Sequence, residues 1–301
     1  MTTPSDPSLR AIMSERQQLI NLAYRLLGSL ADAEDVLQET YARWYAMTRD
    51  QQEAIQNPAA WLTTVASRIC LDLLGSARAR RERYVGEWIP EPVPDSTEWA
   101  GVRAATDPAD RVTLDESVNM AFLVVLDAMT PAERVAFVLH DVFRYSFAEV
   151  GEIVGRSAAA CRQLASSARR RIRDAHAPAT PPVRSAGIVR EFKEAWQAKD
   201  IEALIGLLDP AVTATGDGGG LATAALHPVV GGVDVAQYFV DLAVRAEAPL
   251  PILERTVNGQ PGLVIQQDGV TVAVLAFDVA DNRIKHIWAV RNPEKLRPWT
   301  V

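Results

Sequence analysis

Residues 146 to 173 read SFAEVGEIVGRSAAACRQLASSARRRIR, and this stretch decides the first part of the fold. Ser146 and Glu149 have the spacing of a capping box, so a short helix is expected to begin there, and Gly155 is typical of a helix end. A second helix is expected from residue 158 onward. Two helices joined by a tight glycine turn are the plan of a helix-turn-helix, whose second helix enters the major groove of DNA.

Helical spacing divides the second helix into two faces. Ala160, Leu164, Ala168 and Ile172 are expected to point inward. The outward face holds arginines with no acid between them, which suits contacts with base edges near the helix start and with phosphates further on. The alternative is a solvated basic face, but such a face favours acids interspersed for i,i+4 pairing. The predicted DNA-contacting residues are Ser157, Arg162, Gln163, Ser166, Arg169, Arg170 and Arg173.

The length and charge of the chain set its broad class. At 301 residues it exceeds the usual size of one core, so two or three domains are expected. The net charge is −7, but arginines gather at 78 to 83 and at 156 to 173, which keeps nucleic-acid binding open. No apolar stretch is long enough to span a membrane and no signal-peptide pattern opens the chain, so a cytoplasmic protein is expected. Cys70 and Cys161 have no Cys or His neighbours at ligand spacing, which argues against a metal site or disulfide.

The first 84 residues predict a bundle of helices. Gly28 is expected to end the first helix, and Asp32 to cap the second. Asn57 followed by Pro58 predicts the start of another helix, which Gly75 is expected to stop.

A proline-rich stretch follows the bundle. Prolines at 90, 92 and 94 exclude a helix interior and predict an extended linker. Trp88, Ile89 and Trp99 within it are costly to leave in water, so they are expected to dock on another part of the chain. The predicted parts are a helical bundle at 10–84, a linker at 85–111, a helix-turn-helix domain at 112–176, a linker at 177–187 and a third domain at 188–301.

The third domain changes from helical to strand periodicity. Two amphipathic helices are expected over 188 to 210, and runs rich in Val and Ile follow. The turn pairs between these runs are Asn258-Gly259, Asp268-Gly269 and Asp281-Asn282. An α+β domain with a curved antiparallel sheet is therefore expected.

The order of the helical elements resembles regions 2 and 4 of the extracytoplasmic-function class of bacterial RNA polymerase sigma factors. The stretches that carry this resemblance are DAEDVLQETYARWY at 32–45, NPAAWLTTVASRICLDLL at 57–74 and residues 126–172. It implies a multi-domain protein with two all-α sigma domains, a region 2 helical bundle and a region 4 helix-turn-helix.

The third domain resembles the SnoaL-like domains of the NTF2-like superfamily, which are α+β cones. WIPEP at 88–92, DGGG at 217–220 and NPEKL at 292–296 are similar to motifs of the sigma-factor subgroup that carries such a fusion. That subgroup usually has leucine where Ile89 stands and aspartate where Glu294 stands. Both differences are conservative.

The resemblance implies partners and roles. The implied partners are core RNA polymerase, through its β′ coiled coil and its β subunit, and promoter DNA. A separate anti-sigma partner is left open but is not required, and a small-molecule ligand in the cone is also left open. No cofactor is implied, because the polymerase performs the catalysis. The residues implied to bind polymerase are Asp32, Asp35, Gln38 and Glu39, although acids at this place also compensate a helix dipole. Those implied to contact the −10 element are Asn57, Trp61, Arg68, Arg78, Arg80 and Arg81, with Trp61 also fitting a core position.

A regulatory contact is expected where the three subgroup motifs occur. Its residues are Trp88, Pro90, Glu91, Pro92, Asp217, Gly218, Gly219, Gly220, Asn292, Pro293 and Leu296. The glycine run lacks the spacing and lysine of a phosphate loop. Candidate bases for catalysis are Asp217, His227, Asp234 and His286, but none has a convincing partner in the sequence. Two alternatives therefore remain beside the sigma factor, namely a ligand-sensing helix-turn-helix repressor and a SnoaL-type isomerase or cyclase.

Overall fold

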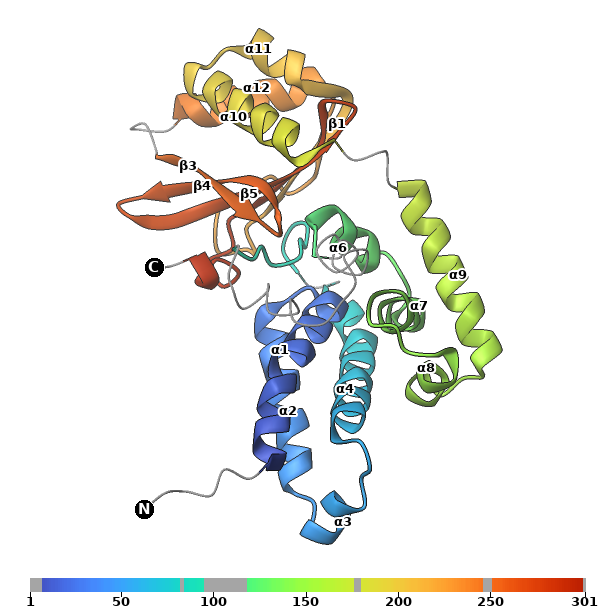
Figure 1. Cartoon of the computed structure of the whole chain (residues 1–301). Coiled ribbons are helices and arrows are strands. Elements are labelled where there is room, and N and C mark those ends of the chain that lie inside the picture. The colour runs from blue at the N-terminus through green and yellow to red at the C-terminus, as the bar shows by residue number, and fades with distance from the viewer. Residues whose placement is uncertain (1–6, 82–83, 95–117, 176–179, 246–250, 300–301) are drawn as a thin grey trace. The chain divides into compact units, whose positions relative to one another are not determined.

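The structure is a computed structural model, and its described residues form two units (Figure 1). We call the first the helical unit and the second the sheet unit. The described residues are 7–81, 84–94, 118–175, 180–245 and 251–299. The helical unit takes residues 7–79 and 125–172 of these, and the sheet unit takes 80–81, 84–94, 118–124 and those from 173 onward. No helix in the described ranges is long and apolar enough to cross a bilayer.

The helical unit begins with the predicted bundle. Its helices are α1 (Pro7–Leu27), α2 (Leu30–Tyr45), α3 (Arg49–Glu53) and α4 (Pro58–Arg81). Gly28 adopts the left-handed conformation at the end of α1, as expected, with φ 71°. Leu22, Leu26 and Leu62 are fully buried in its core.

Two of the predicted helix boundaries are wrong. Ser29, and not Asp32, caps α2, because the Ser29 hydroxyl accepts the Asp32 N–H at 3.2 Å. Gly75 does not stop α4, which continues to Arg81. A glycine inside a helix costs only about 1 kcal/mol, and good helix formers such as alanine and arginine follow it. Asn57 does cap α4, since its Oδ1 accepts the Ala60 N–H at 3.1 Å.

The next elements along the chain are α6 (Met120–Asp127), α7 (Pro131–Phe137), the π-helical turn η2 (Val138–Val142), α8 (Phe147–Val154) and α9 (Ala158–Ala175). The predicted helix-turn-helix is formed by α8 and α9, and the helical unit takes these elements from residue 125 to residue 172. A full capping box opens both α7 and α8 as predicted, and Gly155 ends α8 with φ 70°. The π-helical turn was not predicted.

The sheet unit combines helices with one six-stranded sheet. Its elements are α10 (Pro182–Ala198), α11 (Ile201–Leu207), β1 (Leu208–Asp217), β2 (Val229–Val230), α12 (Gly232–Arg245), β3 (Ile252–Val257), β4 (Gln260–Gln267), β5 (Val270–Ala280), β6 (Arg283–Val290) and the 3-10 turn η3 (Arg297–Trp299). The strand order is β2-β1-β6-β5-β4-β3, and all three predicted turn pairs join strands. The sheet is not wholly antiparallel, because β1 runs parallel to β6.

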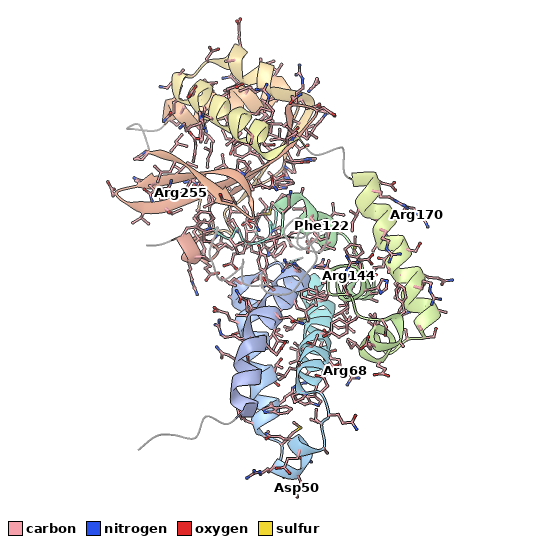
Figure 2. All side chains as sticks on the ribbon, in the orientation of Figure 1. Asp50, Arg68, Phe122, Arg144, Arg170 and Arg255 are labelled. Atoms are coloured by element: carbon pink, nitrogen blue, oxygen red, sulfur yellow. The ribbon has the colours of Figure 1, made fainter. Side chains whose placement is uncertain are left out.

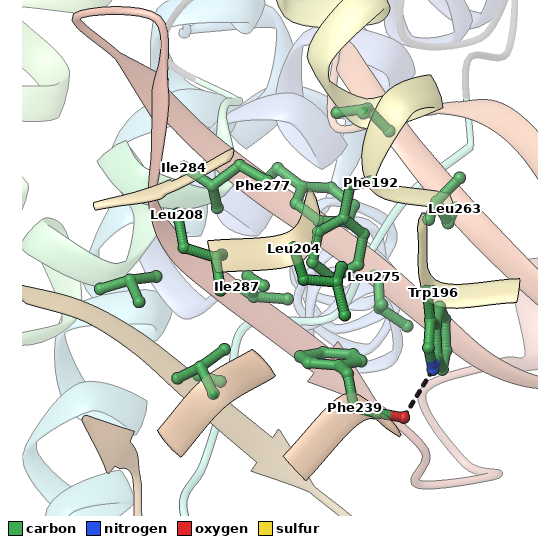
Figure 3. Close-up of a cluster of buried hydrophobic side chains, with 14 of the residues drawn as sticks. Phe192, Trp196, Leu204, Leu208, Phe239, Leu263, Leu275, Phe277, Ile284 and Ile287 are labelled. Carbon is green, nitrogen blue, oxygen red and sulfur yellow. Dashed lines mark hydrogen bonds between the residues drawn. The ribbon is translucent and has the colours of Figure 1, made fainter. Parts of the chain in front are cut away.

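Both faces of this sheet are buried within the unit. One face packs on α10, α11 and α12 around Phe192, Trp196 and Phe239, and the Trp196 indole donates to the Phe239 carbonyl at 2.8 Å (Figure 3). On the other face, Trp288 clusters with Ile89 of the predicted linker and with the start of α6. The expected docking of the linker is therefore observed for Ile89, while Trp99 lies outside the described residues.

Candidate functional site

Helix α9 presents a basic outer face. Ser157 caps it by accepting the Ala160 N–H at 3.2 Å. Cys161, Ala165 and Ala168 are fully buried, so the inward face is centred on these residues, and the predicted Ala160, Leu164 and Ile172 lie at its half-buried margins. Arg170 stands on α9 in Figure 2. The exposed members of the predicted DNA-contacting set are Ser157, Arg162, Gln163, Ser166, Arg170 and Arg173.

Arg169 differs from the other predicted residues of this face. It is half-buried, and its Nε lies 2.6 Å from an Asp141 carboxylate oxygen. Arg162 is also oriented, since its guanidinium lies 5.3 Å from the centre of the Phe147 ring. The acid beside Arg169 comes from the π-helical turn, which spacing along α9 alone does not reveal.

Glu133 links α7 to α9. Its carboxylate accepts bonds from Ser167 at 2.8 Å and from Thr130. Burial acts to raise the pKa of this carboxyl, but the hydrogen bonds from Ser167 and Thr130 outweigh burial and hold the pKa below its usual range. Helix α9 is thus fixed to α7 by an ionised group.

Helix α2 carries the predicted acidic face. Asp35, Gln38 and Glu39 are exposed on one side of the helix, and Asp32 is half-buried in the first turn. Glu39 pairs with Arg43 at 2.8 Å in an exposed i,i+4 ion pair. The structure therefore brings Asp35, Gln38 and Glu39 together.

The residues predicted for −10 contacts are distributed along α4. Trp61 is half-buried and packs edge-on against Trp44, with ring centres 5.3 Å apart. Arg68 is exposed on α4 (Figure 2), and its guanidinium donates to the Glu152 carbonyl at 2.9 Å. Asn57 uses its side chain as a cap. Arg78, Arg80 and Arg81 belong to α4, but their side chains lie outside the described residues.

Asp217 is the centre of a buried polar network in the sheet unit. It is fully buried at the end of β1. One carboxylate oxygen accepts the Tyr84 hydroxyl at 2.6 Å, and the other accepts the Ile89 N–H at 3.0 Å and the Lys295 ammonium at 2.7 Å. The Asp217 backbone carbonyl accepts the N–H groups of Arg291 and Asn292. The Asp217 side chain and backbone therefore join the end of β1 to Tyr84 and Ile89 on one side of the sequence and to residues 291–295 on the other.

Lys295 also bonds to the predicted linker. Its ammonium also donates to the Ile89 carbonyl at 2.5 Å and lies 4.2 Å from the centre of the Trp88 ring. The Tyr84 ring is the second aromatic neighbour, at 5.1 Å. Burial and the hydrogen bond to Asp217 raise the pKa of the Tyr84 phenol, so it stays protonated and donates.

The glycines after Asp217 allow close approach of the chain. Gly219 and Gly220 have φ of 59° and 73°, a conformation that glycine adopts without strain. A Cβ on Gly219 would lie 2.3 Å from Nδ2 of Asn292 and 2.9 Å from the Tyr84 hydroxyl. Asn292 itself donates to that hydroxyl at 2.8 Å. The glycine run therefore serves a tight contact, in keeping with the sequence argument against a phosphate loop.

The three subgroup motifs meet in this network. Pro90, Glu91 and Pro92 are buried, and the Pro92 carbonyl accepts the Trp299 indole N–H at 2.8 Å. In the last motif Leu296 is buried and Pro293 is exposed. Sequence reasoning did not single out Tyr84 or Lys295. The occurrence of Lys295 inside NPEKL was the available signal, whereas Tyr84 carried none.

The candidate catalytic bases are not brought together. Both Asp217 oxygens already accept hydrogen bonds, and His227 and Asp234 are exposed. His286 lies 3.3 Å from Asp278 and stacks on Trp288. In the described ranges, no three His, Cys, Asp or Glu side chains are grouped to hold a metal.

Comparison with known proteins identifies the parts of the chain. Residues 11–80 match the family model of Sigma-70 region 2, and residues 119–172 match that of Sigma-70 region 4. The ECF RNA polymerase sigma factor SigJ of Mycobacterium tuberculosis is 39% identical over 292 residues, which cover 93% of this chain and 90% of SigJ. The probable ECF sigma factor SigI of the same species is 33% identical, over 97% and 96% of the two chains. The crystal structure of SigJ superposes with a TM-score of 0.73 at 37% identity, over 97% of this chain and 98% of SigJ.

Proposed function

Because this chain belongs to the extracytoplasmic-function RNA polymerase sigma factors, we propose that its helical unit binds core polymerase and promoter DNA under the control of its C-terminal α+β domain. The observation that carries this proposal is the pair of sigma regions in order, in a chain similar to SigJ along almost its whole length. Its site of action is the cytoplasm, where the polymerase transcribes.

Helix α9 reads the −35 element in this proposal. Arg162 and Gln163 stand near the helix start, where base edges are reached, and Arg170 and Arg173 stand further along, where phosphates are reached. Their exposure supports the assignment. Arg169 attracts DNA phosphates less than its neighbours do, because the Asp141 carboxylate 2.6 Å away offsets its positive charge.

The acidic face of α2 binds the polymerase. Asp35, Gln38 and Glu39 are exposed together, and acids of this kind suit a basic partner surface such as the β′ coiled coil. Charge complementarity of this kind sets the rate and register of docking more than its final affinity.

Helix α4 takes part in −10 recognition. Its exposed Arg68 supports a role with the melted strand, as does the basic run that ends the helix. The edge-on packing of Trp61 against Trp44 favours a supporting role for Trp61 over direct base stacking.

The C-terminal domain acts as a regulator in this proposal and performs no catalysis. The buried bonds that Asp217 and Lys295 make to Ile89 support this role, because they attach the domain directly to the linker. Phe192, Trp196 and Phe239 pack against one another between the helices and the sheet. Because these aromatic side chains fill the interior of the domain, we favour a packed core there over a ligand-binding cavity.

Reconstitution with bacterial core RNA polymerase tests the proposal. We expect transcription from a promoter with paired −35 and −10 elements only when the protein is added. Tight binding to duplex DNA without any association with core polymerase would instead support a repressor. The regulatory part is wrong if Asp217→Ala, Trp88→Ala and deletion from Asn292 all leave transcription unchanged.

A further inference from the structure

Three planar side chains contact one another in a row beside the first turns of α9. The Arg162 guanidinium lies over the Phe147 ring, with its central carbon 5.3 Å from the ring centre. The Phe147 ring in turn stacks on the His140 ring, with the two centres 3.7 Å apart and the planes inclined by 25°. The three residues belong to α9, α8 and η2. The row therefore ties an exposed arginine of the basic face to the two elements that precede α9.

The His140 end of the row is fixed by hydrogen bonds. Nδ1 of His140 lies 2.7 Å from the Tyr145 carbonyl oxygen, and because a carbonyl only accepts, Nδ1 carries the proton. Phe147 is the first residue of α8, and the capping box of Ser146 and Glu149 sets its backbone. The Phe147 ring is therefore held both by its own backbone and by the ring on which it stacks.

Two neighbouring residues of η2 act on two arginines of α9 in different ways. His140 supports the Phe147 ring beside Arg162, whereas Asp141 pairs with Arg169 at 2.6 Å. The two arginines are seven residues apart, which is about two helical turns or about 10 Å along the axis. A carboxylate offsets the charge of its arginine and accepts from its N–H groups. An uncharged ring leaves the charge and the planar fork of donors available, so Arg162 is the arginine equipped to bind a ligand.

An arginine held in this way suits the recognition of guanine. Guanine presents two acceptors in the major groove, O6 and N7, which match the fork of a guanidinium. Arg162 is exposed and is the fifth residue of α9, and residues near the start of a recognition helix are those that reach base edges. A guanidinium that already lies on a ring loses less rotamer freedom on binding than a mobile one. The stack therefore favours binding in one orientation.

We propose that Phe147 is a positioning residue that sets the Arg162 guanidinium for bidentate recognition of one guanine in the −35 element. The inference rests on the proposed function, in which α9 reads that element. It makes promoter choice depend on a side chain that acts through another side chain. A Phe147 that only supported the fold would affect every position of the element alike, whereas a positioning Phe147 affects one position.

Selection from a DNA library tests the proposal. The probe is a library of linear duplexes randomised at both promoter elements, which full-length protein binds together with bacterial core polymerase before the bound fraction is sequenced. Arg162→Ala should relax the preference for guanine at one position by about fivefold to a hundredfold. Phe147→Leu should relax it at the same position by about two- to fivefold, the factor of an exposed cation–π contact. Phe147→Tyr keeps the ring face and should retain the wild-type preference.

Val154→Ala is the matched control, because Val154 is half-buried at the other end of α8. It should change the affinity for all sequences alike and the preference at no single position. Non-specific duplex binding by Phe147→Leu should keep the wild-type salt slope, since no charge is removed. Circular dichroism checks the fold of each variant, and Phe147→Met, which also lacks the ring, replaces Phe147→Leu if the leucine variant is unfolded.

Three results would overturn the positioning role: an unchanged preference in the folded Phe147 variant, an equal loss at every position, or no position that depends on Arg162. Failure of the proposed function looks different. If the wild type selects a motif alone but no paired elements with polymerase, the protein is a repressor, and the same comparison at that motif still judges Phe147. If the wild type selects no sequence under either condition, both proposals are wrong.

Discussion

Asp217 and Lys295 form a 2.7 Å ion pair in which the aspartate side chain is fully buried and the lysine side chain is 10% exposed. Both partners also bond to the backbone of Ile89 in the linker. Buried ion pairs add little over apolar packing, but breaking one leaves an uncompensated charge. This pair therefore specifies where the linker docks more than it adds to stability.

Replacing Asp217 by Asn should weaken the sheet unit by about 3–5 kcal/mol, because the Lys295 ammonium would remain buried without its counter-charge. Urea unfolding measures the free energy, and proteolysis within 84–94 reports release of the linker. The matched control is Asp209→Asn, which breaks a more exposed pair with Lys285 and should cost less. Equal losses in the two variants would refute the argument. Adding Lys295→Met to Asp217→Asn should recover part of the loss.

Gly219→Ala should destabilise the docked linker by more than the backbone strain of a left-handed alanine alone. The new Cβ would collide with Asn292 and with the Tyr84 hydroxyl, so the polar network must shift. Gly269→Ala is the control, because Gly269 has φ 79° but nothing within 4 Å of the added carbon, which leaves only the backbone strain of a left-handed alanine, about 1–2 kcal/mol. Thermal unfolding and linker proteolysis should separate the two variants. If the two variants unfold and are cleaved alike, the close approach of Asn292 and Tyr84 to Gly219 does not hold the linker.

Asp141→Asn should strengthen binding to duplex promoter DNA. Arg169 would lose its counter-charge and become available to phosphate, so the slope of affinity against salt should steepen by about one unit. Arg170→Ala should weaken binding and reduce the slope by about one. Fluorescence anisotropy across a salt series measures both. If Asp141→Asn binds no more tightly than the wild type, Arg169 does not contact DNA.

Glu133 should make the helical unit sensitive to acid. Its pKa in the folded state lies below the usual range, so its carboxylate stabilises the fold above the unfolded pKa of about 4.3, and this contribution disappears as the pH falls through the lower folded value. Glu133→Gln should therefore be less stable than the wild type at pH 7, and the gap should close in acid. Glu53→Gln, at an exposed ion pair, should show little difference at either pH. A gap for Glu133→Gln that is independent of pH would contradict this assignment.

Local chemistry explains which parts of the fold were predictable. The capping boxes at Thr130 and Ser146 and the three hairpin turns were predicted because each is set by a few adjacent residues. The parallel pairing of β1 with β6 was missed because the two strands lie far apart in the sequence. Helix α12 was missed as well. The amphipathic spacing of Val235, Ala236 and Phe239 was the signal for α12.

The candidate sites follow the same division. Motif resemblance predicted that WIPEP, DGGG and NPEKL belong together, and their residues do meet around Asp217. It did not find Tyr84, whose partner Asp217 lies 133 residues away in the sequence. Nothing in the local sequence distinguishes a tyrosine that bonds at such a distance.

The docked linker has a consequence for biosynthesis. Trp299 closes over Pro92, and the two residues are 207 positions apart. At about 5–20 residues per second, the ribosome needs roughly 10–40 s to make the intervening chain. The cluster around Trp288 on the sheet therefore stays incomplete until Trp299 has been made. During that interval the earlier-made regions 2 and 4 exist without the completed sheet unit.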